Sequence, residues 1–181
     1  TLRNILAAAC LLLPLWACAH NIEKGQRVPP VGIADRENDS RQMISLAIKL
    51  ESAQLAGKVR VVQHIAGRTS AKEKNANLVE AIKAAKFPHD RYQTTTIVNT
   101  DDAIPGSGMF GFKLESNKKL YPWSQFIVDS NGVTRKAWQL EEESSAIIVL
   151  DKEGRVQWVK DGALTQEEVQ QVVAAAAQAV G

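Results

Sequence analysis

The stretch from Val59 to Ala85 constrains the fold most, because it reads as a strand, a tight loop and a helix in direct succession. Val59 to Ile65 is rich in β-branched residues and is about as long as an ordinary strand. After the loop, Leu78 and Ile82 recur at the spacing of one helix face. The stretch therefore predicts a buried strand followed at once by a helix over residues 71–85.

Ser70-Ala71-Lys72-Glu73 marks the expected start of this helix. A serine followed three residues later by a glutamate is the pattern of a capping box, in which the two side chains satisfy free backbone amides. We therefore expect Ser70 to cap the helix. Tyr92 to Asn99 comes next and has strong strand propensity, so the three elements predict a right-handed βαβ unit.

Two similar segments follow the βαβ unit. Phe126 to Trp138 and Ile148 to Trp158 each contain an apolar run, an Asp-x-x-Gly turn and a second apolar stretch. Gly132 and Gly154 can take positive φ at these turns, so we expect a β-hairpin in each segment. Thr165-Gln166-Glu167-Glu168 is a second capping box, and the apolar residues after it predict a final helix.

The order of these elements indicates the fold class. A βαβ unit, an antiparallel hairpin and a helix give an α/β protein with a mixed β-sheet flanked by helices. This is the core layout of a thioredoxin-like fold, here with an N-terminal extension and an extra β-hairpin. We expect residues 20–181 to form a single thioredoxin-like domain.

Residues 1–19 have the organisation of a secretory signal peptide. Arg3 supplies a positive charge, Ile5 to Leu13 form an apolar core, and Ala17-Cys18-Ala19 fits a cleavage site. We therefore expect cleavage before His20 and a location in the periplasm. The alternatives are a buried N-terminal helix and lipidation at Cys18.

If residues 1–19 are removed as a signal peptide, the composition of the chain excludes several classes of function. Both cysteines, Cys10 and Cys18, lie in the expected signal peptide, so the exported chain has no thiol. Thiol–disulfide exchange and peroxiredoxin chemistry need a thiolate, so neither activity is expected. The net charge of +2 gives no broad basic field, so we expect no nucleic acid and, after cleavage, no membrane as a partner. No cofactor is expected.

The loop Gly67-Arg68-Thr69-Ser70 is the first candidate site. The free amides and dipole of a helix start, the guanidinium of Arg68 and two hydroxyl groups would together suit a phosphate, sulfate or carboxylate. The alternative is that Gly67 only forms the turn, Ser70 only caps the helix and Arg68 is solvated.

His64 is the second candidate, because it lies near the carboxyl end of the central strand, where ligands gather in parallel α/β sheets. It could act as a general base for Ser70 or Thr69 in a hydrolase-type enzyme. The alternative is a histidine that is hydrogen-bonded in the core. No Gly-x-Ser-x-Gly motif supports the enzyme.

Two weaker candidates concern metals. Asp101 and Asp102 follow a strand and could hold a hard cation, but no further ligands come at the spacing of a calcium loop. The alternative is a solvated loop. After cleavage, His20 could chelate copper through its amine and imidazole, and only His64 and His89 could supply a second histidine. We therefore expect no metal centre.

Several stretches resemble the YtfJ family of exported Gram-negative proteins, namely Gln63 to Asn75, Tyr92 to Gly108, Tyr121 to Phe126 and Ser144 to Gly162. The resemblance implies a periplasmic protein with a thioredoxin-like fold and no settled biochemical activity. Some members carry the label of transcriptional regulator. In thioredoxin-like reductases the loop after the central strand holds Cys-x-x-Cys, whereas here it reads Gly67-Arg68-Thr69-Ser70.

The sequence therefore favours a periplasmic binding or interaction module without redox cysteines, whose partner is a periplasmic protein or a small anion. A hydrolase-type enzyme that uses His64 with Ser70 or Thr69 is the alternative from another class. A transcriptional regulator is the third, and the signal peptide and the lack of a basic stripe disfavour it.

Overall fold

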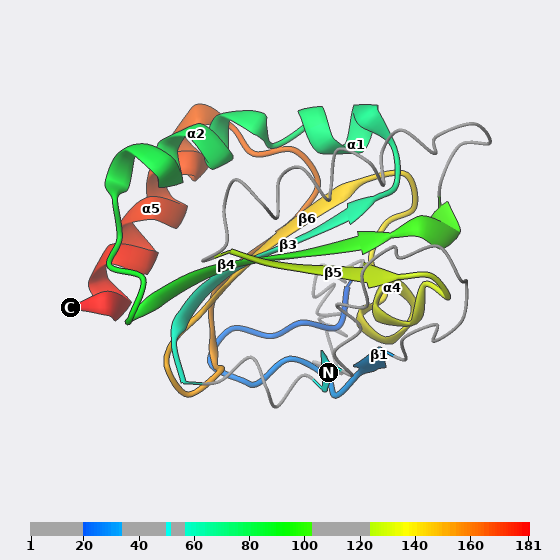
Figure 1. Cartoon of the computed structure of the whole chain (residues 1–181), viewed down its shortest axis with the longest axis horizontal. Helices are drawn as coiled ribbons and strands as arrows, with labels where there is room; N and C mark the ends of the chain where they lie inside the picture. Colours follow the sequence, from blue (N-terminus) through cyan, green and yellow to red (C-terminus); the bar gives the residue numbers. More distant parts are fainter. Residues whose placement is uncertain (1–19, 34–49, 52–56, 103–123) are drawn as a thin grey trace, which may run out of the picture.

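A mixed sheet forms the centre of the computed structural model, which describes residues 20–33, 50–51, 57–102 and 124–181 (Figure 1). Within these residues five strands lie in the order β5-β4-β3-β6-β7. β3 pairs in parallel with β4 and antiparallel with β6, while β4 pairs in parallel with β5 and β6 antiparallel with β7. The strands are β3 (Val59–Ala66), β4 (Tyr92–Asn99), β5 (Gln125–Asp129), β6 (Ser145–Leu150) and β7 (Val156–Asp161).

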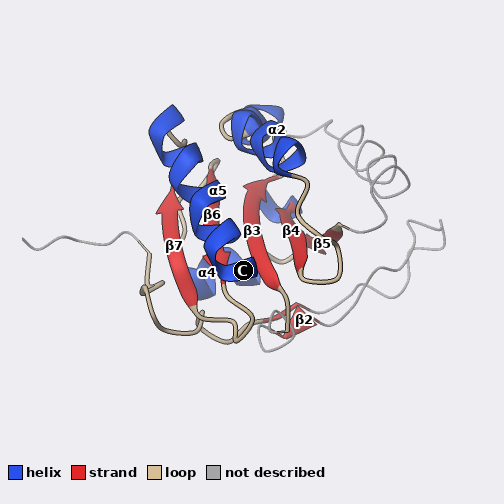
Figure 2. Cartoon of the chain, turned by 90° about the vertical axis from the view of Figure 1, so that its left-hand side faces the viewer, coloured by secondary structure: helices blue, strands red, loops and turns tan. Residues whose placement is uncertain are grey.

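Helices cover both faces of the sheet (Figure 2). The face that we call the α2 face carries α1 (Thr69–Glu73), α2 (Ala76–Ala85) and α5 (Gln166–Val180). The opposite face, the α4 face, carries α4 (Val133–Trp138) and the short ladder of β1 (Gly32–Ile33) with β2 (Leu50–Glu51). The predicted class, a mixed sheet flanked by helices with an N-terminal extension, is confirmed.

Each face of the sheet holds its own hydrophobic cluster, because successive residues of a strand point to opposite faces. Val59 and Val61 of β3 pack with Leu78 of α2 and Val172 of α5. Val62, the residue after Val61, packs on the α4 face among other apolar side chains, which include Ile97, Ile127, Trp138 and Ile148. All eight residues of β3 are buried, including the polar Arg60, Gln63 and His64.

The helix predicted over residues 71–85 is instead two helices, with a break at Asn75. The Asn75 side chain, 1% exposed, leaves the helix and reaches the sheet. Its Nδ2 donates to Ser145 Oγ at 3.0 Å, and its Oδ1 accepts from Leu164 N at 2.9 Å. Side-chain hydrogen bonds of asparagine compete with helical geometry, and here they separate α1 from α2.

The predicted cap at Ser70 is also wrong. Ser70 lies inside α1, and Arg68 occupies the N-cap position in an extended conformation without a side-chain capping hydrogen bond. α1 is only five residues long and begins at Thr69, one residue before the serine of the expected box. Thr165 behaves as predicted, because it forms a complete capping box with Glu168 at the start of α5.

The first of the two expected hairpins is wrong, and the second is confirmed. β6 and β7 form the hairpin around Gly154. The chain after β5 turns into α4 instead, with Gly132 at φ 62° as its N-cap residue. Asp129 explains the difference, since its carboxylate accepts hydrogen bonds from Val133 N and Thr134 N at the start of the helix, at 3.2 and 2.8 Å.

In the described part of the chain, no helix combines the length and the apolar character that spanning a bilayer requires. Met43, Leu46, Ala47 and Leu50 recur at helical spacing and predict a helix over residues 43–52, which lie mostly outside the described residues. Leu50–Glu51, at the end of this segment, is in β2. The expected signal peptide, residues 1–19, also lies outside them.

Candidate functional site

The candidate loop follows β3 at the carboxyl edge of the parallel strands. Gly67 is buried, and its amide donates to Asn99 O at 2.9 Å, so that amide is not free for a ligand. Thr69 and Ser70 are exposed at the start of α1. The turn of η2 (Thr100–Asp102) lies next to this loop, because β4 is the parallel neighbour of β3.

Arg68 joins two of the candidate sites into one cluster. Its Nε and Nη2 donate to Asp102 Oδ1 at 3.1 and 2.9 Å, and Nη2 lies 3.2 Å from Glu143 Oε1. The other oxygen of Asp102 accepts from Glu143 N at 2.5 Å. Asp102 therefore ties the loop after β3, the turn after β4 and the turn before β6 to one another.

This cluster changes the electrostatic argument for an anion site. The side chains of Arg68 and Asp102 are 21% and 13% exposed, so water screens their charges only in part. With Asp102 and Glu143 beside it, the guanidinium is neither solvated nor available without competition. Anion binding at Gly67 to Ser70 stays a prediction, and it would have to displace a carboxylate from Arg68.

His64 lies on the other face of the sheet from Thr69, one of the two hydroxyl-bearing residues proposed as its partners. In the strand register it stands between Ile97 of β4 and Ala146 of β6, whose side chains belong to the α4 face. Thr69 instead lines a groove on the α2 face. The structure therefore does not bring His64 and Thr69 together for hydrolase chemistry.

The environment of His64 favours a neutral imidazole. The side chain is 3% exposed, and its Nε2 has no hydrogen-bond partner among the described residues. Burial lowers the pKa of His64 to about 4; the charges of Asp129 and Asp102 act in the opposite direction, and that of Arg135 adds to the lowering. His64 is thus a core histidine, but without the hydrogen bond at Nε2 that a core position usually supplies.

The residues proposed for metals do not converge. Asp101 is exposed, whereas Asp102 is engaged with Arg68 and Glu143. His20 Nδ1 accepts from Ile22 N at 3.3 Å, and His89 is exposed in the turn before β4. Within the described ranges, no three His, Cys, Asp or Glu residues are grouped as metal ligands would be.

A groove of about 1080 Å³ lies on the α2 face, beside the candidate loop. Its floor is formed by β3 and β4 and one wall by α2. Sequence reasoning missed it, because its polar residues come from separate strands and helices and form no motif. The described lining includes apolar Ile65, Ile82 and Phe126, hydroxyl-bearing Thr69, Thr94 and Thr96, the basic side chains of Lys72, Lys83 and Lys86, and the acidic side chains of Glu73 and Glu80.

The arrangement of these elements is shared with thioredoxin-like proteins. The candidate thiol:disulfide interchange protein DsbE of Chlorobium tepidum superposes with a TM-score of 0.58 over 88% of this chain and 99% of that one. Its sequence identity is 12%, so the similarity shows the fold alone. The chain is therefore a thioredoxin-like α/β protein.

Sequence comparison places the chain in a particular family. Residues 22–179 match the family YtfJ_HI0045, described as a bacterial protein of unknown function, and the chain belongs to it. The chain is 74% identical over 175 residues to the uncharacterized protein YtfJ of Escherichia coli (strain K12), covering 96% of this chain and 95% of that protein. An uncharacterized protein of Haemophilus influenzae is 43% identical over 176 residues, covering 94% and 95%.

Proposed function

We propose that this chain is exported to the periplasm and acts there as a redox-inert binding protein on a thioredoxin-like scaffold. The groove on the α2 face is the observation that carries the binding role. Its volume is at the upper end of the range for ligand pockets, and its lining combines apolar walls with a few polar groups.

The chemistry of the lining indicates the class of ligand. Ile65, Ile82 and Phe126 offer apolar surface to the body of a ligand. Lys72, at the end of the groove near Thr69, is exposed and forms no ion pair within the described residues, so its charge is available to an anion. We infer that the ligand has an apolar body and one anionic group.

The absence of a redox role rests on the loop sequence. Gly67 to Ser70 contains no cysteine where reductases of this fold carry their pair, and both cysteines of the chain precede His20. The protein processed before His20 should leave insulin unreduced above background. Export is tested separately, since the mass of periplasmic protein should correspond to a chain that starts at His20.

Anilinonaphthalene sulfonate, which joins an apolar ring system to a sulfonate, tests the groove directly. We expect saturable fluorescence enhancement and roughly fivefold weaker binding by Lys72→Glu, since one favourable charge becomes repulsive. Lys136→Glu in α4 makes the same charge change outside the groove and should bind the dye as the wild type does. Equal weakening by both variants, or no saturable binding, would overturn the proposal.

A further inference from the structure

Four segments of the chain meet at the amino edge of β3, opposite the candidate loop. Backbone hydrogen bonds join them: Val59 N donates to Arg91 O at 3.0 Å, and Gly57 N donates to Lys152 O at 2.6 Å. Gly25 N donates to Val156 O at 2.7 Å, which brings the segment before β1 to the start of β7. Residues 24–27, 57–58, 86–91 and 151–155 therefore form one continuous end of the molecule, which we call the basic end.

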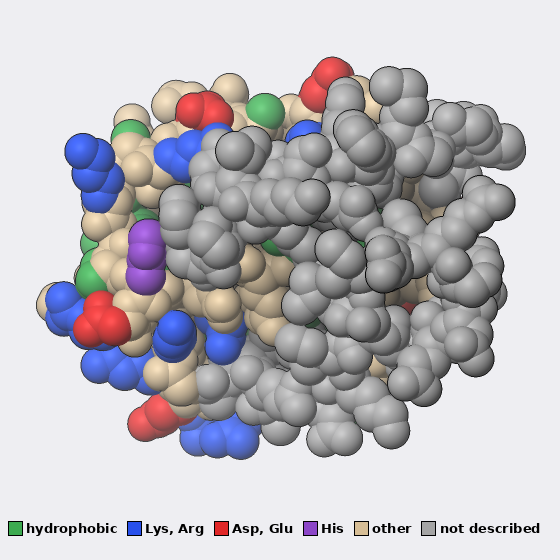
Figure 3. Space-filling view, viewed as in Figure 1, with side chains coloured by type: hydrophobic (Ala, Val, Ile, Leu, Met, Phe, Trp, Pro, Cys, Tyr) green, Lys and Arg blue, Asp and Glu red, His purple; other side chains and the backbone are tan. Residues whose placement is uncertain are grey.

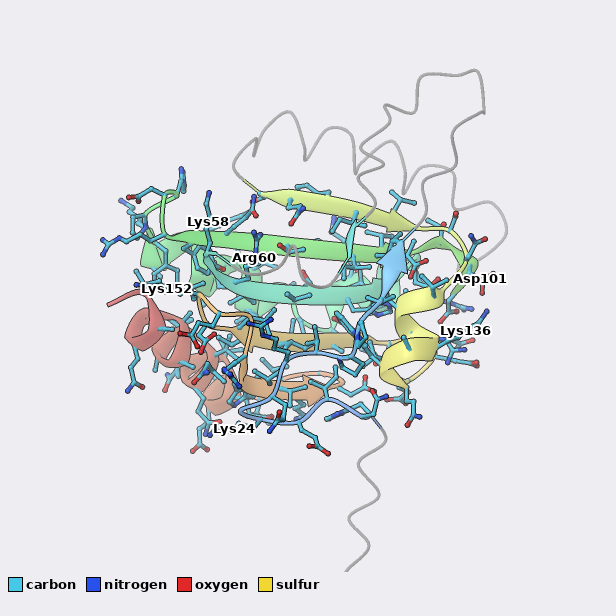
Figure 4. The ribbon with its side chains drawn as sticks, turned by 90° about the horizontal axis from the view of Figure 1, so that it is seen from below. Lys24, Lys58, Arg60, Asp101, Lys136 and Lys152 are labelled. Atoms are coloured by element: carbon cyan, nitrogen blue, oxygen red, sulfur yellow. The ribbon has the colours of Figure 1, made fainter. Side chains whose placement is uncertain are left out.

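Cations without ion pairs gather at the basic end. Figure 4 shows Lys24, Lys58 and Lys152 on this side of the molecule, far from Asp101 and Lys136 at the opposite edge. Figure 3 shows several Lys and Arg side chains at the same end, on the left, with acidic side chains among them. Within the described residues, five cations here form no ion pair: Lys24, Arg27, Lys58, Lys86 and Lys152.

The carboxylates of the basic end offset these charges only in part. Glu153 is engaged with Arg155, and Asp151 accepts hydrogen bonds from the amides of its own turn. Glu23 and Asp90 are the remaining acidic residues in and beside these segments. At the opposite edge, by contrast, Arg68 and Arg135 are paired with Asp102 and Glu142. The chain has a small net charge, yet these cations without ion pairs lie at one end of the strands and the two carboxylate-paired arginines at the other.

The surroundings of these cations select the kind of partner. The cations project from four separate turns, so they cover a broad surface, which a narrow strand of nucleic acid would not match. Val128 of β5 is the only exposed large apolar side chain among the described residues, so the basic end offers no apolar anchor of the kind that stabilises protein–protein interfaces. A broad cationic surface without apolar anchors fits a flat array of negative charges.

We propose that the basic end binds the anionic headgroups of a phospholipid membrane, as a reversible, salt-sensitive contact without insertion. This replaces the expectation, drawn from net charge alone, that the processed chain has no membrane partner. The basic end shares Lys86 with the groove proposed above, whereas Lys24 and Lys152 do not line that groove, so variants of these two lysines test the contact separately.

Sedimentation of the protein with lipid vesicles tests this contact. We expect binding at low ionic strength to phosphatidylcholine vesicles that contain phosphatidylglycerol, no binding to pure phosphatidylcholine, and release by salt. Lys24→Glu and Lys152→Glu should each weaken binding at least about fivefold, the factor expected for loss of one basic residue at an anionic surface. Both side chains are exposed, so neither variant should disturb folding.

Lys136→Glu is the matched control, since it makes the same change of charge at the opposite edge and should bind vesicles as the wild type does. Equal weakening by all three variants would overturn the proposal, because net charge would then be the cause. Failure to bind anionic vesicles would overturn it as well. Binding to soluble polyglutamate but not to vesicles would assign the basic end to an acidic macromolecule instead.

Discussion

Arg68 Nη2 lies 2.9 Å from Asp102 Oδ1, and the two residues come from loops after neighbouring parallel strands. Sequence reasoning treated these loops as separate candidates, one for an anion and one for a cation. The structure joins them, so each candidate charge is compensated by the other. Arg68 belongs to the loop after β3, which contains no cysteine.

Asp102→Asn should increase the affinity of the loop Gly67 to Ser70 for anions. Removing this carboxylate charge frees Arg68 to form a charge-assisted hydrogen bond, so sulfate should bind roughly tenfold more tightly than to the wild type. Calorimetric titration measures the change. Asp90→Asn removes an exposed carboxylate elsewhere and is the control. Identical sulfate affinity in wild type and Asp102→Asn would show that Arg68 is not the limiting group.

Acid should destabilise the fold through His64. The folded-state pKa of about 4 lies below the ordinary value of 6.5, so the unfolded chain binds the proton more readily. Stability from this group is complete above the unfolded pKa, falls as pH decreases from about 6.5 to about 4, and changes no further below that. The loss amounts to roughly 3 kcal/mol.

Urea denaturation at a series of pH values checks this prediction. His64→Gln removes the titrating group, so over that pH range its stability should fall by roughly 3 kcal/mol less than that of the wild type. His89→Gln, at an exposed histidine, is the control and should keep the wild-type slope. Parallel slopes for wild type and His64→Gln would assign the acid sensitivity to other groups.

Asn75→Ala should cost about 2–4 kcal/mol in the free energy of unfolding, because it leaves the partly buried amide of Leu164 and the buried hydroxyl of Ser145 without their partner. Asn77→Ala, at an exposed position of α2, should change it by less than about 0.5 kcal/mol. Urea denaturation of the two variants measures the difference. A similar small effect for both would contradict the role assigned to Asn75.

Gly132→Ala should destabilise α4 for two reasons. The residue has φ 62°, and an added Cβ would lie 3.1 Å from Asp101 Oδ2 and 3.3 Å from Asn99 Oδ1. Gly25→Ala, at φ 84° with open space around the added Cβ, introduces backbone strain without the close contacts. Thermal unfolding should show a loss of about 1 kcal/mol for Gly25→Ala and a clearly larger one for Gly132→Ala. Equal losses of stability in the two variants would show that the close contacts at Gly132 have no energetic effect.

Helices and strands could be predicted from the sequence where the intrinsic preference of the residues agrees with the place that the tertiary structure gives them. Tyr92 to Asn99 is rich in threonine and β-branched residues and forms β4 over the same range.

The two Asp-x-x-Gly segments look alike, yet one becomes a hairpin and the other a helix start. Asp151 accepts from the amides of Glu153 and Arg155 within its turn, whereas Asp129 accepts from those of Val133 and Thr134. Whether such a segment forms a hairpin or begins a helix depends on the amides from which its aspartate accepts hydrogen bonds, and the shared motif does not specify these amides.

The candidate site was only partly predictable for a similar reason. The position of the loop after β3 follows from the strand–loop–helix pattern. Its partners do not, since Asp102 lies 34 residues after Arg68 and Glu143 a further 41 residues along. Glu143 also adopts φ 55°, unusual for a glutamate, and nothing in its local sequence marks it. Pairing over such separations is fixed by the sheet and not by any neighbouring residue.

β3 supplies side chains to both hydrophobic clusters, Val61 to one and Val62 to the other. Losing either layer therefore removes support from a strand on which the other layer depends. The two layers should behave as a single cooperative unit, and the amides of β3 should exchange with solvent deuterium only when the whole domain opens. A thioredoxin-like sheet of this kind cannot release one face for a partner while the other stays folded.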